Sequence, residues 1–297
     1  MRAGSKRNFA PYLMLIPWVI GFIVFKIYPI LISFVYSLME YPILGDPEFI
    51  GFDNYVHIFT NDDVFRSSIA ATMKYAVRNR FTPLSLKYVL IGTPCVLVTS
   101  FFVAYILNFK LKGVNLFRTA YYIPSILGGN VAVSILWIQL FDVNGPVNML
   151  LGIFGAEPVF WLKEESFAVI TLILLKTWQF GSTMLIFLAA LQNVSASLYE
   201  AANLDGATKL QQLFRITLPI ITPMLLFNMV NVLVKAFQEF NSAYLITKGG
   251  PNYTTYFLNV YIYDQAFMNG NYGYASALTW ILLLIIGTLT ALVFSSS

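Results

Sequence analysis

Residue types that could carry out catalysis or hold a metal are scarce in this 297-residue sequence. The one histidine, His57, and the one cysteine, Cys95, stand far apart in the chain, which argues against a metal site or a cysteine nucleophile with its base. No G-x-x-x-x-G-K-[ST] phosphate loop occurs, and Gly249-Gly250-Pro251 has the composition of a turn. We therefore predict no catalytic residue, no metal ligand and no ATPase site in this chain.

A few ionisable residues stand inside otherwise apolar stretches, namely Lys26, Lys176, Lys235 and Glu239. Charges at membrane depth are costly unless they are paired or hydrated, so they mark either a wet path or a contact between helices. Lys235 and Glu239 are four residues apart, and on one helix face they would form an internal ion pair. An ion-driven carrier usually has intramembrane carboxylates in partnership, and the sequence offers no such pair.

Membrane helices are the elements that must position these residues. Charged residues make up 11% of the sequence and hydrophobic residues 58%, whereas a soluble domain has roughly 25% charged residues. A bilayer-spanning helix needs roughly 20 apolar residues. The candidate stretches are Tyr12–Leu38, Leu84–Leu107, Ala120–Phe141, Phe167–Leu191, Ile216–Phe240 and Ala275–Phe294. The sequence thus predicts an all-α, polytopic membrane protein with about six spans and a single domain over residues 1–297.

The positions of lysine and arginine predict the orientation. Short basic segments fall on one side of this topology, and they contain Arg2, Lys6, Arg7, Lys110, Lys112, Arg118, Lys209 and Arg215. Because short loops rich in these residues stay in the cytoplasm, both termini are predicted to be cytoplasmic. Lys74, Arg78 and Arg80 disagree, since they precede the second stretch on the outer side. The basic residues are scattered, so we expect no nucleic-acid partner.

The segment between the fourth and fifth stretches, residues 195–219, has the pattern of a short helix followed by a turn. Ser195 or Ser197 can cap a helix, and Glu200 then lies in its first turn, where the helix dipole favours an acidic side chain. Gly206 suits a helix end or a sharp turn, and Pro219 marks entry into the next span. Such an element could be gripped and moved by a partner protein.

The spacing in this segment resembles the EAA loop of permeases from ATP-binding-cassette (ABC) importers. The residues that carry the resemblance are Glu200, Ala201, Ala202, Asp205, Gly206, Ile216, Leu218 and Pro219. In that family the loop forms a coupling helix, which sits in a cleft of the ATP-hydrolysing subunit. The resemblance implies the permease fold of type I ABC importers, with ATP and magnesium bound by the partner ATPase and none by this chain.

Other motifs narrow the resemblance to carbohydrate importers, and within these to the first permease of maltose-, lactose- and glycerol-phosphate-type systems. They are Phe52-Asp53-Asn54-Tyr55, Phe117-Arg118-Thr119, Ile123-Pro124-Ser125, Thr247-Lys248-Gly249-Gly250-Pro251 and Gly273-Tyr274-Ala275-Ser276-Ala277. Such systems imply a second permease, an ATPase dimer and an extracytoplasmic solute-binding protein as partners, in a bacterial cytoplasmic membrane. The 74–87 segment, with Lys74, Arg78, Arg80 and Lys87, departs from the family pattern.

Matching motif to motif also implies a solute path, in the third, fourth and fifth stretches. The residues carried over are Ser125, Gly129, Asn130, Lys176, Trp178, Gln179, Lys235, Gln238 and Glu239. Each could equally serve contacts between helices. Lys176, Lys235 and the outer basic residues raise the hypothesis of an acidic saccharide, either a uronate oligomer of the alginate kind or a phosphorylated sugar. The alternative solute is a neutral oligosaccharide. The alternatives from other classes are an ion-coupled secondary sugar carrier and a membrane-embedded enzyme.

Overall fold

The structure is a computed structural model that describes residues 10–65, 84–109 and 112–295. The predicted outer basic residues Lys74, Arg78 and Arg80 lie outside these residues. The chain divides into two compact units, one made of residues 1–62 and 262–282 and the other of residues 63–261 and 283–297. We describe each unit by itself.

Helices dominate the described chain, as the composition predicts. The α-helices are α1 (Ala10–Phe22), α2 (Tyr28–Ser37), α3 (Asp53–Thr60), α5 (Leu84–Leu107), α6 (Val114–Leu127), α7 (Val131–Leu140), α8 (Pro146–Ile153), α9 (Glu165–Trp178), α10 (Gly181–Gln192), α11 (Ala196–Leu204), α12 (Lys209–Gln212), α13 (Leu218–Phe237), α14 (Leu258–Tyr263) and α15 (Tyr272–Ser295). Short π-helical turns are η1 (Ile23–Ile27), η3 (Leu213–Thr217), η4 (Ala243–Thr247) and η5 (Asp264–Met268). Two strands, β1 (Met39–Glu40) and β2 (Glu48–Phe49), pair antiparallel.

Within the described residues, four helices are long and apolar enough to cross a membrane. Two bent helix pairs, α6 with α7 and α9 with α10, raise this number to six if each pair forms one span. Each of these segments overlaps one of the apolar stretches of the sequence. The bends differ, at 102° between α6 and α7 and 45° between α9 and α10.

The sharper bend follows from local sequence. Gly129 has a φ of +79°, a conformation that favours glycine because it has no Cβ. Asn130 then begins α7 as its N-cap, and its Oδ1 accepts a hydrogen bond from the Ala132 amide at 2.9 Å. One helix therefore stops and another begins within three residues.

The fifth span is longer at its start than predicted, and it stops earlier. The helix runs without a break from Lys209 to Phe237, with the π-helical turn η3 directly before Pro219. Proline lacks an amide hydrogen and clashes with the carbonyl four residues back. A π turn places that carbonyl differently, so Pro219 does not break the helix. The turn η1 precedes Pro29 of the first span in the same way.

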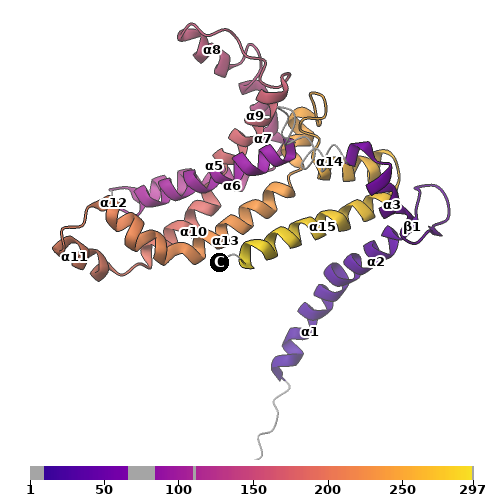
Figure 1. The fold of residues 1–297 in the computed structure, drawn as a ribbon, viewed down its shortest axis with the longest axis horizontal. Helices are drawn as coiled ribbons and strands as arrows, with labels where there is room; N and C mark the ends of the chain where they lie inside the picture. Colours follow the sequence, from indigo (N-terminus) through magenta and orange to yellow (C-terminus); the bar gives the residue numbers. More distant parts are fainter. Residues whose placement is uncertain (1–9, 66–83, 110–111, 296–297) are drawn as a thin grey trace, which may run out of the picture. The chain divides into compact units, whose positions relative to one another are not determined.

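In the second unit, α5 is the central helix and contacts α9, α10 and α13 (Figure 1). Two apolar clusters fill the space between these helices. Tyr88, Leu172 and Val260 belong to one cluster, and Met184 and Phe187 belong to the other. Figure 1 places α8 at one end of this unit and α11 with α12 at the other.

In the first unit, the structure explains why Asn54 and Gly273 occur in two of the motifs that carry the family resemblance. Buried Asn54 donates hydrogen bonds to the carbonyls of Ser37 and Met39, at 3.0 and 2.9 Å, and so holds the end of the first span. Gly273 lies so close to Met39 that a Cβ there would stand 2.0 Å from the Met39 carbonyl oxygen. A larger residue cannot occupy position 273 without moving the backbone.

Candidate functional site

A polar cavity of about 370 Å³ lies inside the second unit, where three helical segments are interrupted. These interruptions separate α6 from α7, α9 from α10, and α13 from η4. The predicted path residues that line the cavity are Ser125, Gly129, Asn130, Lys176, Gln179, Lys235, Gln238 and Glu239. Broken helices of this kind allow backbone and polar side chains at membrane depth to face a wet cavity.

Trp178 is the predicted path residue that does not line the cavity. Its ring packs 5.9 Å from that of Trp137, measured between centroids. The reason is helical geometry. Lys176 and Gln179 are three residues apart and share a face, while Trp178 points elsewhere.

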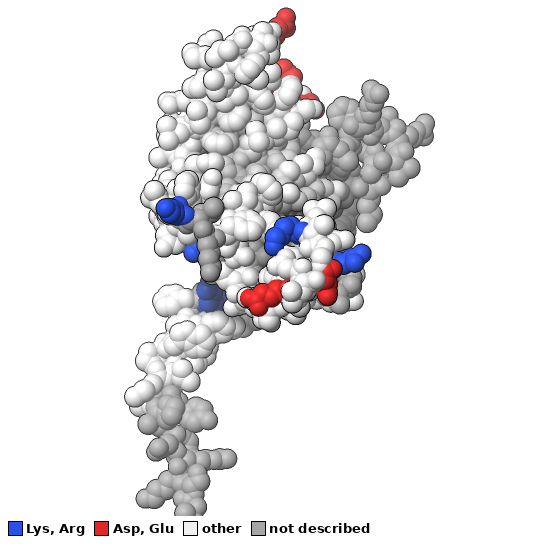
Figure 2. Space-filling model, turned by 90° about the vertical axis from the view of Figure 1, so that its left-hand side faces the viewer, with Lys and Arg blue, Asp and Glu red and all other residues white. Residues whose placement is uncertain are grey.

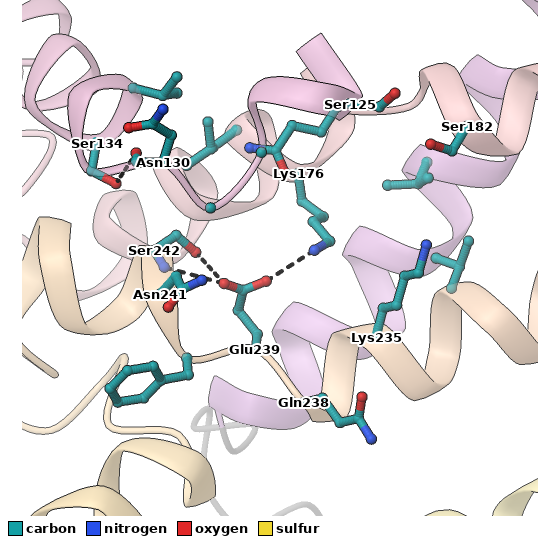
Figure 3. Close-up of a pocket in the computed structure, with 18 of the residues that line it drawn as sticks. Ser125, Asn130, Ser134, Lys176, Ser182, Lys235, Gln238, Glu239, Asn241 and Ser242 are labelled. Carbon is teal, nitrogen blue, oxygen red and sulfur yellow. Dashed lines mark hydrogen bonds and ion pairs between the residues drawn. The ribbon is translucent and has the colours of Figure 1, made fainter. Parts of the chain in front are cut away.

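Glu239 is the most heavily bonded residue of the cavity. Its Oε2 lies 3.0 Å from Lys176 Nζ and 3.4 Å from the Tyr88 hydroxyl. Its Oε1 accepts hydrogen bonds from the Ser242 hydroxyl at 2.7 Å and from the Ser242 amide at 3.2 Å. The carboxylate is buried, and it joins α9 to the start of the next helical segment (Figure 3). Through the Tyr88 hydroxyl it also contacts α5.

The ion pair suggested by the spacing of Lys235 and Glu239 does not form. Helix α13 ends at Phe237, so Glu239 leaves the helix face that Lys235 occupies. Lys235 stands in the last turn of α13 and is exposed to the cavity. Across the part of the chain that the structure describes, its ammonium group has no hydrogen-bond or ion-pair partner.

Amide side chains supply the remaining polar surface of the cavity. Those of Gln179, Gln238 and Asn241 make no hydrogen bond with another described residue, so they are free to bind a ligand. Gly128 and Gly129 let two of them approach the bend between α6 and α7. A Cβ at Gly128 would stand 2.9 Å from Gln179 Oε1, and one at Gly129 would stand 2.9 Å from Asn241 Nδ2.

The second candidate site is the helix-turn segment at the other end of the same unit. Helix α11 begins after Ser195, one of the two predicted caps, and ends before Asp205, but the Ser195 side chain makes no capping hydrogen bond. The prediction that Glu200 lies in the first turn is wrong, because Glu200 is the fifth residue of the helix. Gly206 follows with a φ of +76°, and the Ala207 amide bonds back to the Ala202 carbonyl at 2.9 Å. This is a glycine-terminated helix end.

Two polar contacts attach α11 to the base of the fifth span. Gln212 is buried, and its Nε2 donates to Asn203 Oδ1 at 2.7 Å and to the Ala207 carbonyl at 3.2 Å. The Tyr199 and Thr217 hydroxyls lie 2.8 Å apart, and Thr217 is also buried. These contacts join α11 firmly to the helix that continues from Lys209 through Ile216, Leu218 and Pro219 into α13.

The outer surface of this segment combines charge with exposed apolar side chains. Figure 2 views the end of the unit that carries α11 and α12, where acidic and basic groups gather on a largely uncharged surface. Exposed charged residues of the segment are Glu200, Asp205, Lys209 and Arg215. Leu204 is 90% exposed and Leu210 is 66% exposed, and no residue that the structure describes covers either side chain. Apolar side chains in such a position suit a partner surface.

Comparison with known proteins identifies the family. Residues 64–296 match the sequence profile of the family described as "Binding-protein-dependent transport system inner membrane component". The chain belongs to this family. The family resemblance drawn from the loop at 200–219 is therefore confirmed, and the chain is a membrane permease with several apolar helices.

Individual members show how far the similarity reaches. The chain is 41% identical over 299 residues to the "Probable ABC transporter permease protein YesP" of Bacillus subtilis, covering 100% of this chain and 93% of the relative. It is 33% identical to the "Lactose transport system permease protein LacF" of Rhizobium radiobacter, covering 91% and 88%. A solved bacterial alginate ABC transporter, in complex with an alginate pentasaccharide-bound periplasmic protein, contains a similar chain with a TM-score of 0.78, 25% identity and coverage of 97% and 93%.

The structure adds cavity-lining residues that the motifs of this permease did not indicate. Asn241 and Ser242 line the cavity after the end of α13, and Ser134, Ser182 and Thr183 line it from α7 and α10. Sequence offered one hint of these residues. Gly181 and the polar residues Ser182 and Thr183 interrupt an apolar stretch, a pattern that indicates a broken membrane helix.

Proposed function

We propose that this permease is the transmembrane subunit of an ATP-driven importer that carries a saccharide across the bacterial cytoplasmic membrane by alternating access. The observation that carries the proposal is the exposed helix-turn segment tied to the fifth span by the Gln212–Asn203 and Tyr199–Thr217 contacts. A partner that moves α11 must also move α13, which lines the cavity at Lys235 and Gln238. The segment therefore acts as the coupling helix.

ATP hydrolysis belongs to a separate subunit, which binds ATP and magnesium. Glu200 meets basic or polar groups of that subunit, and Leu204 and Leu210 fill an apolar hollow on it. This chain contributes no catalytic residue to the reaction. Its own task is to pass the closure of the ATPase dimer into the membrane helices, which requires inward and outward states of different affinity for the solute.

The cavity holds part of the transported saccharide. The side-chain amides of Gln179, Gln238 and Asn241 make no hydrogen bond with another described residue. They suit sugar hydroxyls, which both donate and accept hydrogen bonds. A volume of about 370 Å³ falls within the range of roughly 300–1,000 Å³ common for small-ligand sites. The names of the lactose permease and of the alginate transporter support a saccharide.

The importer contains a second permease, an ATPase dimer and an extracytoplasmic solute-binding protein. Both termini of this chain and the α11 segment lie on the cytoplasmic side, because the short basic loops belong there. Lipid surrounds the spans, and the binding protein docks on the opposite face. The solute-bound periplasmic protein in the alginate transporter structure supports that partner.

The complete complex, purified and placed in proteoliposomes, tests the proposal. Gly206→Pro distorts the helix end where φ is +76°, and Glu200→Lys reverses an exposed charge. Both variants should abolish saccharide uptake while capture by the binding protein stays normal. Normal solute-stimulated ATPase activity in both variants would contradict the role given to α11.

An ion-coupled sugar carrier makes a different prediction. Such a carrier would work as this chain alone, under a proton or sodium gradient and without ATP. Reconstitution of the chain without its partners should therefore give no gradient-driven uptake, and uptake under those conditions would overturn the ATP-driven mechanism.

A further inference from the structure

We propose that Lys235 binds a carboxylate of the transported saccharide, so that the solute of this permease is an acidic sugar. The inference rests on the proposed saccharide import and adds the chemical class of the solute. It separates the two lysines of the cavity, which the sequence cannot distinguish. Among the described residues, Lys176 has an ion-pair partner and Lys235 has none.

Lys176 is already neutralised. Its Nζ lies 3.0 Å from Glu239 Oε2, and this carboxylate is held in place by Ser242 and Tyr88. A solute carboxylate that approached Lys176 would also approach Glu239 and be repelled by it. Lys176 therefore fixes the corner between α9 and the end of α13 and does not select the charge of the solute.

Lys235, unlike Lys176, has no acidic partner among the described residues. Figure 3 shows its side chain extending into the cavity from α13, while Lys176 points to Glu239. Within the described residues no acidic side chain pairs with Lys235, and the other polar groups of the cavity are neutral amides and hydroxyls. An unpaired cation at membrane depth is costly unless water or an anion reaches it.

The balance of charge in the cavity then defines the solute. Lys176, Lys235 and Glu239 are its charged lining residues, which leaves one positive charge uncompensated. A single carboxylate compensates this charge, and the amides of Gln179, Gln238 and Asn241 remain for the hydroxyls of the same sugar ring or its neighbour. A uronate-containing oligosaccharide has this combination of groups.

A carboxylate of the second permease is the competing partner for Lys235. In that case the lysine would stabilise the assembly and would not discriminate between solutes. The two cases differ in one measurable quantity, the ratio of acidic to neutral uptake. Loss of an assembly contact lowers both kinds of uptake, whereas loss of a solute contact lowers acidic uptake alone.

The experiment uses the whole complex in proteoliposomes with its binding protein and ATP. The probes are uronate di- and trisaccharides from enzymatic digests of alginate and pectin, and the same sugars after chemical reduction of their carboxyl groups to alcohols. Imported sugars are quantified by mass spectrometry. The variants are Lys235→Gln, Lys235→Arg, Lys176→Gln and, as a charge-matched control outside the cavity, Lys112→Gln.

We expect the wild-type complex to import acidic sugars. Lys235→Gln should lower their uptake about 10-fold to 100-fold, the usual effect of losing a charge-assisted hydrogen bond, and leave any uptake of the reduced sugars unchanged. Lys235→Arg should restore most of the acidic uptake. Lys176→Gln should lower both kinds of uptake together, and Lys112→Gln neither.

Equal loss of both kinds of uptake in Lys235→Gln, or no loss, would overturn the inference. Import of only the reduced sugars by the wild type would overturn it too, while leaving saccharide import intact. If the wild-type complex with ATP imported neither the acidic nor the reduced sugars, the proposed function would fail along with the inference. A binding assay with the isolated solute-binding protein is the control for this outcome, because it shows whether the sugars were captured and so could reach the permease.

Discussion

Gln212 and Asn203 join the two arms of the helix-turn segment, with Gln212 Nε2 donating to Asn203 Oδ1 at 2.7 Å. Gln212 is buried and lies at the start of the helix that becomes the fifth span, whereas Asn203 lies in α11. The contact crosses the glycine turn at Gly206. Helix α11 is therefore joined to the start of the fifth span through side chains as well as through the backbone of the turn.

Replacement of Gln212 should loosen this transmission. Gln212→Glu keeps the size of the side chain but removes its donor, and it leaves the Ala207 carbonyl and Asn203 Oδ1 without their bonds. We expect a severalfold rise in the ATP hydrolysed per saccharide imported, with a loss of about 1–3 kcal/mol in stability. Simultaneous assays of ATPase activity and uptake in proteoliposomes measure the ratio.

Gln192→Glu is the matched control, because Gln192 is exposed at the end of α10 and makes no side-chain hydrogen bond with a described residue. This control should keep the wild-type ratio. An unchanged ratio in Gln212→Glu, with stability reduced, would show that the contact serves folding alone.

The hydroxyl pair of Tyr199 and Thr217 makes a second connection to the same span. The oxygens lie 2.8 Å apart, and the Thr217 hydroxyl also lies 3.3 Å from the Gln212 carbonyl. Tyr199→Phe and Thr217→Val each remove one hydroxyl, at an expected cost of about 1 kcal/mol. Because the residues are in contact, the double variant should cost less than the sum of the single ones.

Thermal unfolding of the purified complex measures this coupling. Strict additivity of the two shifts would mean that the hydroxyls contribute independently, and the proposed connection would be absent.

The ion pair between Lys176 and Glu239 in the cavity predicts how removing one or both charges changes the stability of the complex. Glu239→Gln should destabilise the complex by about 1–3 kcal/mol, because Lys176 loses its counter-ion while remaining partly buried. The double variant Lys176→Met with Glu239→Gln removes both charges and should regain part of this loss. The unfolding temperatures of Glu239→Gln, of Lys176→Met and of the double variant, each compared with the wild type, give the measurement. A double variant less stable than either single variant would contradict the pairing.

The same pair shows where sequence reasoning reached its limit. The segment from Phe237 to Asn241 contains no glycine or proline, so nothing in it indicates that α13 ends at Phe237. A continuing helix would have placed Glu239 beside Lys235, four residues earlier. Tertiary contacts with Lys176 and Tyr88, together with a local contact to Ser242, hold Glu239 in place instead, and the tertiary contacts leave no periodic trace in the sequence.

Features set by local chemistry were accessible from the sequence. The spans follow from apolar length, the end of α11 follows from Gly206, and the bend after α6 follows from Gly128, Gly129 and the capping side chain of Asn130. Eight of the nine path residues implied by the family motifs line the cavity, whereas eleven other lining residues, among them Asn241 and Ser242, had no motif to indicate them. Trp178 was carried over with Lys176 and Gln179 by the motif match, but successive helix residues point about 100° apart, so its ring lies away from the cavity.

At Gly181 the helix α10 lies close to the backbone of α6, and this contact yields the last prediction. A Cβ at this position would stand 2.4 Å from the Tyr121 carbonyl oxygen and 2.7 Å from the Tyr122 Cα, both backbone atoms of α6. Gly181→Ala should therefore push α10 away from α6 and reduce the yield of folded complex severalfold. Gly287→Ala is the control, since no atom lies within 4 Å of its added Cβ. In a helix interior that change should be neutral or should stabilise by about 0.5–1 kcal/mol. Fluorescence-detected size-exclusion chromatography compares the two variants, and equal yields would show that α6 and α10 adjust their distance freely.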